Sequence, residues 1–198
     1  MGLYVPFFYV EGYGLSINIH PDMAFYMLII MNAASTPGRI LPLYVADKCV
    51  NILLPIHLTD LAFRVGNLTI LIPSTLVSGI ILLVWYKVGA QPGLIAISVF
   101  FGFISGAILA VVPATVAFLC PDMSKIGSRL GMTLFVAGCG LLIGSPVAGV
   151  ILERQSAAAG GKQTFWGLLI FGGVVVLVGC LGHITTRLLK VGFTAKKA

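Results

Sequence analysis

Apolar residues gather in a series of runs along the chain, separated by short segments that carry polar residues, glycine and proline. Five runs, at residues 23–46, 68–86, 94–119, 130–152 and 165–189, approach or exceed the length of about 20 residues with which a helix crosses a bilayer. A sixth run, at residues 3–10, is too short to cross alone. The pattern predicts an all-α integral membrane protein of five to six transmembrane helices, the first of them incomplete.

Composition leads to the same class of protein. Hydrophobic residues make up 59% of the 198 positions and charged residues only 9%, whereas soluble domains carry about 25% charged residues. The formal charge of +6 is scattered between the apolar runs and forms no basic stripe with interleaved aromatic residues, so we do not expect nucleic-acid binding. The four cysteines are widely spaced without a C-x-x-C pair, and we expect neither a metal site nor a cofactor.

The basic residues between the runs predict how the chain is oriented. Cytoplasmic loops of membrane proteins are enriched in lysine and arginine. Alternate segments divide these residues eight to three, which places the C-terminus in the cytoplasm. The eight are Lys48, Arg64, Lys125, Arg129, Arg187, Lys190, Lys196 and Lys197, and the three are Lys87, Arg154 and Lys162.

One polar segment, at residues 32–48, interrupts the apolar run at residues 23–46. Arg39 lies about two turns inside the end of that run, where a charge costs several kcal/mol unless it faces protein, water or a counter-charge. It either faces a central cavity and holds an anionic substrate, or reaches the cytoplasmic headgroups along the lipid boundary. In the run at residues 94–119, Gly102 and Gly106 stand four apart, a spacing that lets two helix backbones approach closely.

Four ordered motifs carry a resemblance to a known family. The pattern Gly38-Arg39, Pro42 and Ala46-Asp47-Lys48 resembles the loop between helices eight and nine of major facilitator transporters, and in particular of fungal relatives of the monocarboxylate transporters. Residues 2–10, 121–132 and 140–149 extend the likeness over nearly the whole chain. The resemblance implies that residues 1–198 are the C-terminal six-helix half, helices seven to twelve, with the first helix truncated.

The resemblance implies a secondary carrier that moves a small organic solute, a monocarboxylate or related metabolite, by alternating access. Arg39 matches an arginine of monocarboxylate transporters, but Ser35 stands where these have an aspartate, so a coupled proton is an open question. We expect Arg39, Ser35, Asn32, Tyr4 and Tyr9 to contact substrate. For Asn32 and the two tyrosines, ordinary helix packing is the competing interpretation.

A second group of residues is expected to position or gate the cytoplasmic ends of the helices. Asp47 and Lys48 stand at the cytoplasmic mouth of the family, where such a pair can clamp neighbouring helices in one state. Gly38 belongs to the same motif, and Gly127 and Arg129 belong to the other cytoplasmic loop. The competing interpretation of Asp47 and Lys48 is a solvated pair of little energetic consequence.

Two departures from the family lead to further expectations. Residues 49–64 have no family counterpart and are expected to be an insertion in the cytoplasmic loop, such as a translated intron. The resemblance covers only the C-terminal half of a transporter, so we expect transport to need an N-terminal half or a second chain. The alternative is a non-transporting, truncated or pseudogene-like fragment.

No hydrolase or metalloprotease motif occurs, and we do not expect an enzyme. The plasma membrane is favoured over the vacuolar membrane.

Overall fold

The structure is a computed structural model that describes residues 2–53, 59–120, 122–160 and 164–195. Its side chains are described in these ranges except at positions 42, 43, 45–53, 59–69, 118, 119, 123 and 190–195. The described residues form six α-helices and two 3-10 turns, without a strand. The helices are α1 (Val5–Ser16), α2 (Pro21–Leu53), α3 (Thr59–Trp85), α4 (Gln91–Leu119), α5 (Ile126–Ala158) and α6 (Trp166–Ala195). The turns Gly2–Tyr4 and Met123–Lys125 precede α1 and α5.

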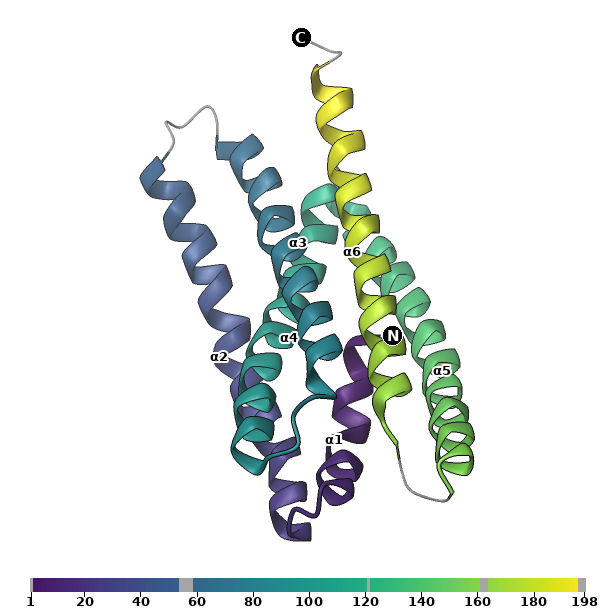
Figure 1. Ribbon diagram of the computed structural model, residues 1–198. Coiled ribbons are helices and arrows are strands. Elements are labelled where there is room, and N and C mark those ends of the chain that lie inside the picture. Colours follow the sequence, from purple (N-terminus) through teal and green to yellow (C-terminus); the bar gives the residue numbers. More distant parts are fainter. Residues whose placement is uncertain (1, 54–58, 121, 161–163, 196–198) are drawn as a thin grey trace.

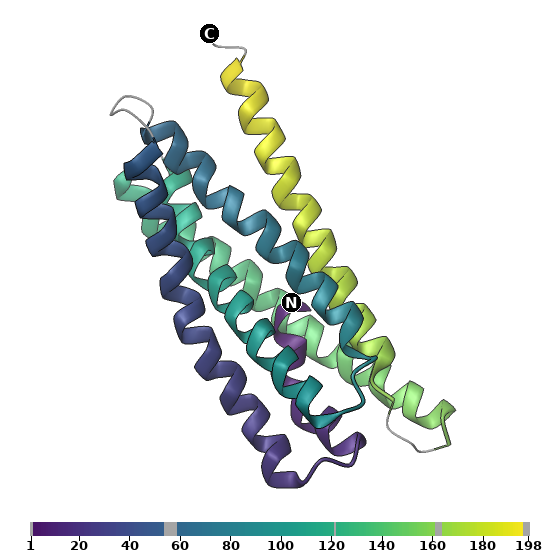
Figure 2. The ribbon, with the colours of Figure 1, turned by 60° about the vertical axis from the view of Figure 1, so that its left-hand side comes forward.

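Successive helices run up and down through one bundle (Figure 1). The C-terminal ends of α1, α3 and α5 lie at one end of the bundle, together with the N-terminal ends of α2, α4 and α6. The far ends of α2 and α4 lie at the opposite end with the C-terminus (Figures 1 and 2). This alternation is the one that the apolar runs predict. Which end faces the cytoplasm stays a prediction.

Three helices of the described part are long and apolar enough to cross a membrane: α4 at Gln91–Ala117, α5 at Ile126–Ala158 and α6 at Trp166–Leu189. The described apolar part of α3, Ile70–Trp85, is shorter, and α2 is not among the three. The predicted all-α integral membrane fold of six helices, with a short first helix, is confirmed. That α2 and α3 also cross is still a prediction.

The helices extend beyond the apolar runs from which they were predicted. α1 continues to Ser16, and α2 continues through Asp47 and Lys48 to Leu53. Backbone hydrogen bonds extend a helix into polar residues beyond an apolar run. A hydropathy pattern alone does not detect that extension. The segment 49–64 was expected to be a loop insertion. Its residues 49–53 belong to α2 and 59–64 to α3, while 54–58 lie outside the described residues.

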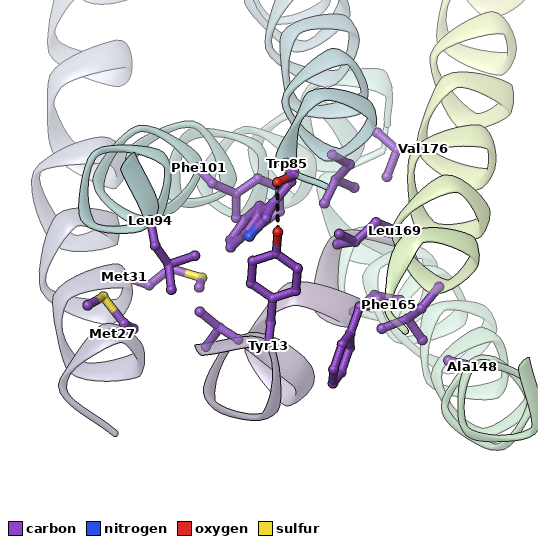
Figure 3. Packing of buried hydrophobic residues seen from close by; sticks show 14 of the residues in the cluster. Tyr13, Met27, Met31, Trp85, Leu94, Phe101, Ala148, Phe165, Leu169 and Val176 are labelled. Atoms are coloured by element: carbon purple, nitrogen blue, oxygen red, sulfur yellow. Dashed lines mark hydrogen bonds between the residues drawn. The ribbon is translucent and has the colours of Figure 1, made fainter. Parts of the chain in front are cut away.

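The main apolar core joins α1 to the other helices around Trp85 and Phe101, whose rings meet edge to face at 5.7 Å (Figure 3). Tyr13, in the last turn of α1, donates a 2.7 Å hydrogen bond to the carbonyl oxygen of Val88 in the turn between α3 and α4. Its ring stands edge-on to Phe165 at the start of α6, 5.7 Å away between centroids. Tyr13 therefore links three parts of the bundle at one end.

Helices α2 and α4 run side by side in the same direction, with their backbones in contact (Figures 1 and 2). A Cβ atom at Gly38 would lie 2.8 Å from the carbonyl carbon of Phe103. A Cβ at Gly102 or Gly106 would lie 3.0 or 2.9 Å from the carbonyl carbon of Met31 or Ser35, respectively. Only glycine fits at this distance, which confirms the close approach predicted for Gly102 and Gly106. We call these contacts the α2–α4 seam.

Candidate functional site

Three exposed polar residues form a stripe on α2 beside the α2–α4 seam. Asn32, Thr36 and Arg39 follow one another at positions i, i+4 and i+7, the spacing that places side chains on one face of a helix. All three side chains are exposed. We call them the α2 polar stripe. Thr36 was not expected as a site residue, although the same spacing in the sequence could have identified it.

The polar atoms of the stripe are largely free to meet a ligand. The Nδ2 atom of Asn32 donates a 2.9 Å hydrogen bond to the carbonyl oxygen of Leu28, and its Oδ1 atom accepts no hydrogen bond from the described residues. Within the described part of the chain, neither Thr36 nor Arg39 has a side-chain partner. The salt bridges found there join His20 to Asp22 and Lys125 to Asp122. The guanidinium thus lacks a counter-charge among the described side chains.

The level of Arg39 along the bundle bears on its two predicted roles. Its neighbour Gly38 packs on Phe103, which lies at the middle of the apolar span Gln91–Ala117 of α4. Arginines that reach the headgroups do so from near helix ends. Arg39 is instead level with the centre of a span, where a charge faces protein, water or a bound anion. Its position favours a cavity-facing cation.

Ser35 and Gly38 lie on the packed side of α2 rather than on the stripe. Ser35 is only 3% exposed, and its hydroxyl donates a 2.7 Å hydrogen bond to the carbonyl oxygen of Asn32. Gly38 is buried inside the helix and does not belong to a loop. The structure gives both residues a packing role in the seam, and the substrate contact expected of Ser35 gains no support from it.

Tyr4 ends the 3-10 turn before α1 and Tyr9 lies within α1, and both side chains are half-buried. The ring of Tyr4 lies 6.3 Å from that of Phe7, and Tyr9 helps to line a small apolar cavity with Tyr13 and Trp85. No hydrogen bond joins either tyrosine to the α2 polar stripe in the described part of the chain. Their surroundings are those of helix packing, and their contact with substrate stays a prediction.

The residues expected to gate the cytoplasmic ends are placed only in part. Asp47 and Lys48 belong to α2, but their side chains lie outside the described residues. Gly127 and Arg129 are exposed in the first turn of α5, not in a loop, because this helix begins at Ile126. A Cβ atom at Gly127 would meet no atom within 4 Å. Close packing therefore does not require a glycine there.

Asp122 organises the turn that leads into α5. Its Oδ1 atom accepts hydrogen bonds from the hydroxyl of Ser124, at 2.8 Å, and from the backbone N–H of Ser124, at 3.1 Å. Its Oδ2 atom lies 3.3 Å from the Nζ atom of Lys125. The hydrogen bonds from Ser124, with smaller contributions from Lys125 and Arg129, lower the pKa of the Asp122 carboxyl. The described residues contain no group of acidic, histidine and cysteine side chains that could hold a metal.

Known transporters are similar to this chain over most of its length. The chain is 34% identical over 179 residues to the MFS-type transporter dbaD of Emericella nidulans, an overlap of 90% of this chain and 36% of the relative. It is 30% identical over 175 residues to the aspyridones efflux protein apdF of the same species, covering 88% of this chain and 33% of the relative. It is 30% identical over 197 residues to the agnestins efflux protein AgnL12 of Paecilomyces divaricatus, covering 99% and 40%.

These similarities support the major facilitator superfamily that the sequence motifs predict. The chain spans well under half the length of each of these relatives. No protein-family model matches the chain. The names of these relatives describe transporters and efflux proteins.

Proposed function

We propose that this chain forms part of a major facilitator transporter that moves a small organic solute across a membrane by secondary, alternating-access transport. The single observation that carries the proposal is Arg39, an exposed cation on α2 at the level of the centre of α4. Secondary transporters hold substrate near the bilayer midplane, between repeated halves. Similarity to MFS-type transporters and efflux proteins adds to this support. We propose a transporter and not an enzyme.

Several finer features belong to the same proposal. The chain corresponds to helices seven to twelve of the fungal monocarboxylate-transporter-like group, with the C-terminus in the cytoplasm and the plasma membrane as its location. The α2 polar stripe forms one wall of the substrate site. The facing wall comes from an N-terminal half or a second chain, because a site between two halves needs both. The cargo is an organic anion, with a proton as a candidate coupling ion.

Arg39 binds the anionic group of the substrate in this proposal. A guanidinium holds a carboxylate through two parallel hydrogen bonds, which an ammonium group does not reproduce. Removing hydrogen bonds to a charged group costs about 1.5–3 kcal/mol, or about 10- to 100-fold in affinity. Arg39→Gln should therefore lower the affinity for substrate about 10- to 100-fold. Arg39→Lys keeps the charge and should lower the affinity by less, without reaching that of the unsubstituted protein.

The experiment uses the full-length protein, as its natural transcript encodes it, in proteoliposomes. Sequencing that transcript also determines whether it contains residues 49–64. Uptake of a panel of labelled organic acids is compared between the unsubstituted protein, Arg39→Gln and Arg39→Lys. Arg154→Gln is the control, since Arg154 is an exposed cation near the end of α5. Uptake that is equal in the unsubstituted protein and Arg39→Gln would contradict the proposal.

A further inference from the structure

We infer that the substrate is an elongated organic anion that carries a hydrogen-bond donor about 6–10 Å from its anionic group. This inference rests on the proposed function and narrows its substrate class. It follows from the order and spacing of the three polar groups in the α2 polar stripe. They are a cation at Arg39, a hydroxyl at Thr36 and an amide oxygen at Asn32.

The anionic group is placed by Arg39 and Thr36 together. They are three residues apart, which sets them on adjacent turns of one helix face. Long helical side chains lean toward the N-terminus of their helix, so the guanidinium of Arg39 extends toward Thr36. Most described hydroxyls within the helices donate to a carbonyl of the preceding turn, as Thr133, Thr185 and Thr186 do. No such bond engages Thr36, whose hydroxyl can donate to the same anion.

The other end of the substrate is defined by Asn32. Its amide nitrogen is engaged by the carbonyl oxygen of Leu28, and since that oxygen only accepts, the amide oxygen is the atom left free. A free amide oxygen selects a donor such as a hydroxyl or N–H group. Asn32 lies four residues from Thr36 and seven from Arg39, which corresponds to about 6 and about 10 Å along the helix axis, so an anion held by both residues lies at a distance between these values. An acid of two or three carbons is too short to reach both.

Two rigid acids differing in one group test the inference. 4-Hydroxycinnamate carries a carboxylate at one end and a phenolic hydroxyl at the other, and cinnamate lacks the hydroxyl. Binding of both acids is measured to the full-length protein in proteoliposomes. The variants are Asn32→Leu, Thr36→Val and, as a matched control, Thr185→Val. Thr185 is exposed on α6, and its hydroxyl donates to the carbonyl oxygen of Leu181 at 2.8 Å.

The unsubstituted protein should prefer 4-hydroxycinnamate by about two- to tenfold, the value of one hydrogen bond. Asn32→Leu should abolish that preference. Thr36→Val should weaken both acids by the same factor, and Thr185→Val should change neither.

Three outcomes overturn the inference: equal binding of the two acids, a preference that survives Asn32→Leu, or binding of neither acid. In each case, Arg39-dependent uptake of other organic acids would leave the proposed function intact. If Arg39→Gln changed the uptake of none of the acids, that result would instead contradict the proposed function itself.

Discussion

Gly38 of α2 packs directly against the backbone carbonyl of Phe103 in α4, with room for a hydrogen atom but not for a side chain. This contact fixes the level of the next residue, Arg39, relative to the middle of the apolar span of α4. It also turns Asn32, Thr36 and Arg39 away from the seam to an exposed face. The packing of small residues and the position of the polar stripe are therefore parts of one arrangement.

The first prediction tests the α2–α4 seam. Gly106→Ala would place a Cβ atom 2.9 Å from the carbonyl carbon of Ser35, closer than real Cβ atoms come to such atoms. The backbones must then separate, and overpacking of this kind costs about 1–3 kcal/mol. Thermal unfolding of the full-length protein in detergent should show a lower midpoint for this variant.

The matched control for the seam is Gly138→Ala in α5, where a Cβ atom would meet nothing within 4 Å. Alanine is a better helix former than glycine by about 1 kcal/mol, so this variant should unfold at the same temperature or slightly higher. Equal midpoints for Gly106→Ala and Gly138→Ala would show that the two backbones are not in contact.

The second prediction concerns the link made by Tyr13. Tyr13→Phe removes the 2.7 Å hydrogen bond to the carbonyl oxygen of Val88 and keeps the aromatic contact with Phe165. The free energy of unfolding should fall by about 0.5–1.5 kcal/mol. Tyr26→Phe is the control, because Tyr26 is 51% exposed and has no hydrogen bond in the described part of the chain. A Tyr13→Phe variant as stable as Tyr26→Phe would contradict the role of this bond.

The number and order of the helices could be predicted from the sequence because lipid demands long apolar segments, which are visible in one dimension. The close approach at Gly102 and Gly106 was also predictable, because two small residues four apart in a helix mark a surface for contact with another helix. The helix that packs against that surface could not be predicted from the sequence. The contact with Ser35 and Gly38 depends on which two helices of the bundle become neighbours.

The candidate site was predicted in part. Arg39 and Asn32 lie on one exposed face, as expected of residues that contact substrate. Ser35, next to Thr36 in the sequence, points to the packed side, while Thr36 completes the stripe. A helix turns by about 100° per residue, so a motif match in one dimension selects adjacent positions whose side chains face different surroundings. The helix ends were also missed, since backbone hydrogen bonding continues beyond the apolar runs.

The third prediction is a pH dependence at Asp122. Because its folded-state pKa is lowered, chiefly by the hydrogen bonds from Ser124, its stabilising effect is complete above its unfolded pKa of about 3.8. The effect is lost as the pH falls through the lower folded-state value. Asp122→Asn should therefore be less stable than the unsubstituted protein at pH 7, and the two should converge in strong acid. A difference in unfolding midpoint that widens in acid would contradict this sign.

The central claim is that the α2 polar stripe faces water or substrate at the middle of the membrane. Thiol accessibility tests it most directly in the full-length protein. Thr36→Cys is compared with Val178→Cys, which lies near the middle of the α6 span Trp166–Leu189 and is 61% exposed. The reagent is a charged, membrane-impermeant methanethiosulfonate, with the unsubstituted protein as background. Modification of Thr36→Cys, with Val178→Cys at background, is the predicted result. Equal modification of the two variants, or none at Thr36→Cys, would contradict the claim.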